Sequence, residues 1–152
     1  MNCFKGCTKL KHILCPNSFT IDSGCFSYSG MTNATDFLQK MTSLSSPEIF
    51  RGCSDLKEVK SDSIILLTER YLFADSGIER VDFPALKTIW NGTYNYGDGN
   101  MFSNCKNLKY VNMPALESIC TAGSVSYFQD ELFYNCVSLE EIELPSLKSI
   151  GV

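Results

Sequence analysis

Few residues of this chain have the types and spacing that enzymatic chemistry requires. The only histidine is His12, so a nucleophile and base pair that uses histidine has one centre, with no serine or aspartate obviously placed beside it. Glu141 and Glu143 are a pair of carboxylates, the groups of general acid–base catalysis. Their two-residue spacing places both on one face of a strand, where charged residues are ordinarily solvated. We therefore interpret all three as surface residues and do not predict an enzyme.

Metal and phosphate sites have equally weak support. The segment NYGDGN, residues 95–100, is glycine-rich but lacks the lysine and following helix of a phosphate-binding loop. Asp98 and Asn100 resemble a calcium loop only in part, because the later glutamate is missing. The eight cysteines contain no C-x2-C pair of the kind that zinc knuckles use. We predict no cofactor and no metal.

Length and charge exclude other classes of function. A chain of 152 residues suits a single domain with a sizeable core. Its net charge of −4 is scattered, without the basic stripe that nucleic acid requires. No apolar run approaches the ~18 residues that span a membrane. The start, MNCFKGCTKLKH, has no apolar signal segment, so we expect a cytosolic protein or a piece of a longer one.

A repeated pattern covers nearly the whole chain and must position all of these residues. The stretch LFYNCVSLEEIELPSLKSIG at 132–151 resembles MFSNCKNLKYVNMPALESI at 101–119. Similar units begin at phenylalanines 22 to 31 residues apart, and most of these spacings suit leucine-rich repeats. The second unit is eroded. This periodicity predicts one solenoid domain, residues 1–152, with six anchors: Phe4, Phe26, Phe50, Phe73, Phe102 and Phe133.

Each repeat contains a segment with the two-residue period of a half-buried strand. Ile142 and Leu144 alternate with charged residues, and proline follows four such segments and stops their ladders. A second apolar pair, such as Leu86 and Ile89, should line the opposite wall of the core. In the other repeats, the apolar positions that correspond to Leu139, Ile142 and Leu144 are Leu10, Ile13 and Cys15, Leu56 and Val59, Ile78, Val81 and Phe83, and Leu108, Val111 and Met113.

Two positions after the anchors have distinctive residue types. The second position carries glycine, asparagine or aspartate, which tolerate positive φ, so we predict one left-handed residue per coil, with Tyr28 as the exception. The third position carries Cys7, Cys53, Cys105 and Cys136. Free cysteine is commonly buried as a small apolar side chain, which predicts an inward column of free thiols beside stacked phenylalanines. The other cysteines on positions predicted to be buried are Cys3, Cys15 and Cys25.

The consensus F-x-x-C-x-x-L-x-x-I-x-[LM]-P-x-L-x-x-I resembles the BspA-like leucine-rich repeats of bacterial and some protozoan surface proteins. FSNCKNLKYVNMPALESI and FYNCVSLEEIELPSLKSI match it closely, and the resemblance covers six units, with the second and the tail of the third weak. It implies an α/β-class, right-handed, strand-rich solenoid with a parallel sheet on the concave face and little regular helix. It also implies adhesion or host-protein binding at a cell surface, outside the cell.

The chain departs from this family pattern at its ends. It begins inside one coil and ends inside another, just after Ile150, and no polar cap sequence is visible. We interpret it as a fragment of a longer array. Open solenoid ends would also allow self-association.

The outward strand positions form the first candidate site for binding another protein. Stacked strands lie about 4.8 Å apart, so outward side chains of successive coils should form a continuous ladder. A solvated face explains the mixed charge of this ladder equally well. The candidate binding residues on it are His12, Glu58, Lys60, Arg80, Asp82, Tyr110, Asn112, Glu141 and Glu143, and the ladder also includes Leu14, Asn33 and Thr35.

Two lengthened connections form the second candidate site. They enter at the same point of consecutive repeats, at 90–101 and 120–132, so the solenoid should place them side by side. Tyr94, Tyr96 and Tyr127 lie there among small residues, a composition that suits recognition. The alternative is that these rings, with Trp90 and Phe128, pack against the flank of the solenoid.

These observations predict a non-catalytic module that binds another protein of unknown identity. Adhesion at a cell surface rests on the family resemblance alone. An intracellular scaffold and a passive spacer remain as alternatives. An intracellular scaffold would have a cytoplasmic location.

Overall fold

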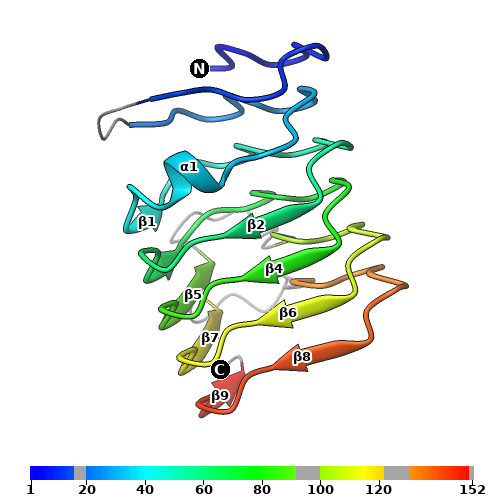
Figure 1. Ribbon diagram of the computed structural model, residues 1–152. Helices are drawn as coiled ribbons and strands as arrows, with labels where there is room; N and C mark the ends of the chain where they lie inside the picture. Colours follow the sequence, from blue (N-terminus) through cyan, green and yellow to red (C-terminus); the bar gives the residue numbers. More distant parts are fainter. Residues whose placement is uncertain (16–19, 92–99, 122–130, 151–152) are drawn as a thin grey trace.

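The computed structural model describes residues 1–15, 20–91, 100–121 and 131–150, which form a stack of coils with a parallel sheet on each of two walls (Figure 1). The first sheet has the order β2-β4-β6-β8 and the second has the order β1-β3-β5-β7-β9. The strands of the first are β2 (Glu58–Lys60), β4 (Arg80–Asp82), β6 (Tyr110–Asn112) and β8 (Glu141–Glu143). Those of the second are β1 (Ser43–Leu44), β3 (Leu66–Leu67), β5 (Thr88–Asn91), β7 (Ser118–Thr121) and β9 (Ser149–Ile150).

The first sheet confirms the strands predicted in the last four repeats. Its central residues, Val59, Val81, Val111 and Ile142, are partners in the parallel register. The first three are buried, while the residues on either side of them face outward or are half-buried. This alternation is what one apolar residue between two polar ones dictates in a strand.

The second sheet is built from the second apolar pair of each repeat. Ile89 pairs with Leu67 on one side and Ile119 on the other, all in parallel register. The prediction that these pairs line the opposite wall is correct. The wall is itself a hydrogen-bonded sheet, so the solenoid is even richer in strands than a single-sheet repeat would be.

The six anchor phenylalanines stack on one another along the whole molecule, as predicted. Ring centroids of successive anchors lie 5.3 to 5.7 Å apart, and the interplanar angles are 13° or less. Four of the rings are at most 1% exposed. Parallel aromatic stacking adds to the area that each ring buries, so this ladder holds neighbouring coils in register.

The cysteine column is only partly buried. Cys53 and Cys105 are buried, Cys136 is half-buried and Cys7 is exposed. Outside the column, Cys15 and Cys25 are half-buried and Cys3 is exposed. These three cysteines and the four of the column are all free thiols. The prediction of burial is wrong for Cys3 and Cys7, because the first coil is covered by a neighbouring coil on one side only.

The left-handed residue two positions after the anchor is present in all six coils. Its φ lies between 56° and 72° at Gly6, Tyr28, Gly52, Asp75, Asn104 and Asn135. Tyr28 was expected to be the exception, yet its N–H donates to the carbonyl of Arg51 at 2.7 Å. The bond between coils holds the backbone in this conformation although tyrosine does not favour it.

The first two repeats depart from the predicted ladder. Residues 11–15 are extended without forming a strand, so His12 and Leu14 lie outside the first sheet. In the second repeat Thr35 begins the helix α1 (Thr35–Leu38), which buries Phe37 and Leu38. Two adjacent buried residues fit one turn of helix and not a strand, whose neighbouring side chains point to opposite faces.

Candidate protein-binding face

The sheet face comprises the eight outward side chains of the first sheet, whose strands β2, β4, β6 and β8 follow one another in Figure 1. Parallel pairing places one row across the strands in the order Glu58, Arg80, Tyr110, Glu141. The same register gives a second row in the order Lys60, Asp82, Asn112, Glu143. The structure thus brings together eight of the twelve outward strand positions predicted for this face, namely those of the last four repeats.

Arg80 connects the first row. Its Nε lies 3.8 Å from Oε1 of Glu58, and its guanidinium carbon lies 6.0 Å from the centroid of the Tyr110 ring. A cation over an aromatic face is attracted by the ring quadrupole, by about 0.5–1 kcal/mol at exposed sites. Tyr110 is 38% exposed. Arginine and tyrosine therefore stand side by side at the centre of an accessible, hydrogen-bonded sheet.

Asp82 connects the second row. Its Oδ2 lies 3.4 Å from Nζ of Lys60, and its Oδ1 accepts a hydrogen bond of 2.7 Å from Nδ2 of Asn112. The Lys60 side chain is 44% exposed and that of Asp82 is 13% exposed, and ion pairs near the surface add about 1 kcal/mol or less to stability. Their main consequence is that these side chains are held in fixed positions.

A third row, which the sequence analysis did not single out, borders the sheet just before each strand. Lys57 Nζ lies 3.3 Å from Glu79 Oε1, and the Tyr110 hydroxyl donates to Glu140 Oε2 at 3.3 Å. In the sequence, this row is marked by a charged residue directly before each strand of the last four repeats. These residues are Lys57, Glu79, Lys109 and Glu140.

The charge of the sheet face changes along the solenoid. On β2 and β4 each charged residue lies near an opposite charge on the neighbouring strand. On β8, Glu141 and Glu143 have no ion-pair partner among the described residues. One half of the face is therefore neutralised internally, and the other half carries uncompensated negative charge next to Tyr110.

The other predicted site residues are not brought to this face. His12 is exposed in the first coil, outside any strand. The structure does not describe residues 92–99 and 122–130, which include Tyr94, Tyr96 and Tyr127. The prediction for the two long connections therefore lies outside the described residues.

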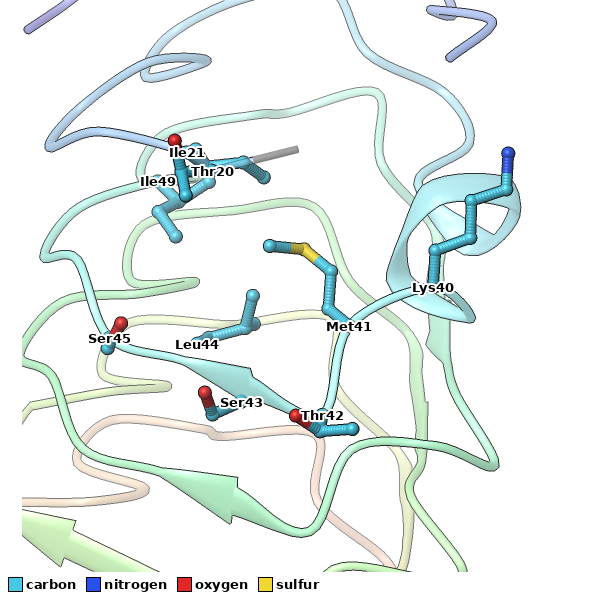
Figure 2. A pocket seen from close by; sticks show the side chains of 9 residues that line it. All are labelled: Thr20, Ile21, Lys40, Met41, Thr42, Ser43, Leu44, Ser45 and Ile49. Atoms are coloured by element: carbon cyan, nitrogen blue, oxygen red, sulfur yellow. The ribbon is translucent and has the colours of Figure 1, made fainter. Parts of the chain in front are cut away.

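A shallow pocket of about 240 Å³ lies at the edge of the second sheet, beside β1 (Figure 2). Met41 and Leu44 point toward Ile21 and Ile49 there, while the ammonium of Lys40 points away. That ammonium donates to the carbonyl of Cys15. Serine and threonine complete the lining, which includes no histidine, cysteine or carboxylate. The pocket thus offers packing surface without a group suited to acid–base or nucleophilic chemistry.

The described residues contain neither a cluster of metal ligands nor a helix that could span a membrane. Among the described residues no three histidine, cysteine or acidic side chains gather in a way that could hold a metal ion. In those ranges no helix has the length and apolar character to cross a bilayer.

The comparison with protein families agrees with the geometry of the coils. The model of the BspA type leucine rich repeat region matches in six copies, over residues 1–98 and 48–152. The chain belongs to this family. No curated protein and no solved structure gives a significant match. Membership of a BspA-type leucine-rich repeat family indicates a protein-interaction module, a class that is generally non-catalytic.

Proposed function

We propose that this BspA-type chain binds a protein partner on the sheet face, with Arg80 and Tyr110 at the centre of the contact. The observation that carries the proposal is the arginine–tyrosine contact on an exposed strand pair in fixed register. Tyrosine and arginine are enriched among the residues that dominate binding energy, because each supplies a large contact area and directional polar groups.

The framework beneath the face supports this role. Val81 and Val111 are buried under Arg80 and Tyr110, so the backbone that carries the two side chains is anchored in the core. A rigid scaffold lowers the entropy lost when a partner binds. The negative half of the face on β8 favours a partner with a basic patch at that end.

The wider role that we propose is adhesion or recognition at a cell surface. It is supported by the family, whose members are typically surface-associated. Intact cells that produce the protein can be treated with a protease that does not enter them. Cleavage of the protein while a cytosolic marker stays intact is the expected result, and protection of both proteins would favour an intracellular scaffold.

Surface substitutions test the binding face itself. A partner can be isolated by crosslinking to the intact chain, and its affinity then compared between the wild type and an Arg80→Ala, Tyr110→Ala double variant. Loss of a hot-spot side chain costs about 2 kcal/mol, which corresponds to a roughly thirtyfold weaker Kd. The control is Lys87→Ala with Glu117→Ala, two exposed residues just before strands of the second sheet. If the Arg80→Ala, Tyr110→Ala variant and the control variant bound the partner with equal affinity, the contact would lie elsewhere.

A further inference from the structure

The row of charged residues beside the sheet face alternates in sign along the solenoid. From β2 to β8 it reads Lys57, Glu79, Lys109, Glu140. The side chains of Lys57 and Glu79 are 55% and 47% exposed, and Lys109 and Glu140 are exposed as well. Four alternating charges are complementary to the same row reversed, because the first residue then meets the last and the second meets the third. Reversal brings Lys57 opposite Glu140 and Glu79 opposite Lys109.

The centre of the sheet face is complementary to itself in the same way. Reversal of the strand order brings Arg80 opposite Tyr110 in the first row and Asp82 opposite Asn112 in the second. Both pairs already attract within one copy, where the Arg80 guanidinium lies 6.0 Å from the Tyr110 ring centroid and Asn112 Nδ2 donates to Asp82 Oδ1 at 2.7 Å. The residues that meet at the centre are therefore chemically matched.

The outer strands are matched at two of their three positions. In the second row Lys60 of β2 meets Glu143 of β8, which is an attraction like that between Lys57 and Glu140. In the first row Glu58 meets Glu141, which is the one contact between like charges. Arg80 offsets it in part, because its Nε lies 3.8 Å from Glu58 Oε1.

We propose that the partner of the sheet face is a second copy of this chain, bound face to face around a two-fold axis that runs parallel to the strands between β4 and β6. The proposal rests on the function proposed above and names its partner. β2 of each copy faces β8 of the other, and β4 faces β6, in an aligned packing of two sheets. A two-fold axis makes every contact occur twice, so each matched pair counts twice.

The second copy supplies the chemistry that the sheet face requires. The negative strand β8 calls for a basic patch opposite it, and β2 of the partner copy brings Lys57 and Lys60 there. Three rows of four residues give twelve side chains from each copy, fewer than the roughly 20–30 of a standard interface. The dimer is therefore weak, with a Kd between about 10 μM and 1 mM.

Sedimentation of the 17.0 kDa chain under reducing conditions tests the dimer. The weight-average mass should rise with concentration, approach that of two chains, and fall on addition of salt, because the two faces attract each other by charge. A mass that stays at one chain up to about 1 mM, or that grows beyond two chains, would overturn this inference. Capture of a different protein on the sheet face would then still support the proposed function, so the two failures are distinguishable.

Charge reversal beside the two-fold axis identifies the contact. Glu79→Lys and Lys109→Glu each place like charges opposite one another twice in the dimer, which should lower the association constant by about tenfold or more. The Glu79→Lys, Lys109→Glu double variant exchanges the two charges within one chain. It should dimerise to within about threefold of the wild type, because each reversed residue meets the other across the axis. A double variant as weak as the single variants would contradict the register.

The control is Lys87→Glu, which makes the same charge change at an exposed residue beside the second sheet and should dimerise like the wild type. Thermal unfolding of each variant is measured first, because Glu79 Oε1 also lies 3.3 Å from Lys57 Nζ in its own copy. Lys109→Glu leaves that pair intact, so it tests the contact even if Glu79→Lys unfolds. A dimer that survives Lys109→Glu at full strength would lie on another surface and contradict the proposal.

Discussion

The Cys105 thiol donates a hydrogen bond to the carbonyl oxygen of Phe73 in the preceding coil, with 3.1 Å between Sγ and oxygen. The Ser76 hydroxyl lies 3.4 Å from the same sulfur. The same thiol-to-carbonyl bond recurs at Cys53 and Cys136, so cysteine at this position joins neighbouring coils instead of forming disulfides. Serine, which is also a small side chain with one donor, takes this position at Ser29 and Ser76, and the Ser29 hydroxyl lies 3.6 Å from the Cys53 sulfur.

Removing this donor should destabilise the solenoid. Cys105→Ala leaves a small cavity and deletes one buried hydrogen bond, which together should lower the free energy of unfolding by about 1–3 kcal/mol. Cys7→Ala is the matched control at the same repeat position, where the thiol is exposed, and should change it by less than about 0.5 kcal/mol. Urea unfolding under reducing conditions measures both. Equal effects would show that burial in the column is not what makes Cys105 important.

The contribution of Cys105 should vanish at alkaline pH. Burial raises the pKa of this thiol from 9.0 to about 12, so the folded state holds its proton where the unfolded state has lost it. A raised pKa gives stability that is complete below the unfolded value and is lost as pH rises toward the folded one. The stability difference between wild type and Cys105→Ala should therefore shrink between pH 9.0 and about 12. A difference that stays constant over this window, measured by urea unfolding, would sink the explanation.

Glycine at the left-handed position should matter most where a neighbour crowds it. A Cβ added at Gly52 would lie 2.4 Å from Cδ1 of Tyr28, whereas one added at Gly6 would have no neighbour within 4 Å. Both residues have positive φ, so alanine costs backbone strain of about 1–2 kcal/mol at either. Gly52→Ala should be the more harmful variant in thermal unfolding. In a Tyr28→Gly background, Gly52→Ala should cost no more than Gly6→Ala does, and a persisting excess would show that the ring is not its cause.

Much of the fold could be predicted from the repeat because its apolar positions recur with fixed spacing. The strand at Val81 is indicated by polar residues on either side, and the Phe73 ring was expected to stack because every coil has an equivalent ring. The second sheet was less evident because Leu86 and Ile89 are three residues apart, a spacing without strand alternation. The sequence does not predict helix α1, because its four residues, Thr35–Leu38, are too few to show a helical period.

The sequence predicts which strand residues of the last four repeats lie on the sheet face, but it does not predict which contacts they make. Alternation along a strand determines that Arg80 and Tyr110 face outward, and the register places them side by side. Which partner Arg80 prefers depends on the rotamers of long side chains and on Glu58 across the neighbouring strand, and sequence does not specify either. The row that includes Glu140 was missed because a single charged residue before each strand has no period of its own.

The central claim is that a protein partner binds the sheet face, and amide hydrogen exchange of the chain with and without a crosslinked or purified partner tests it most directly. The partner should slow exchange in residues 58–60, 80–82, 110–112 and 141–143 relative to the second sheet, and Arg80→Ala with Tyr110→Ala should abolish the difference. Slowed exchange confined to the strands of the second sheet, unaffected by that double variant, would contradict the account.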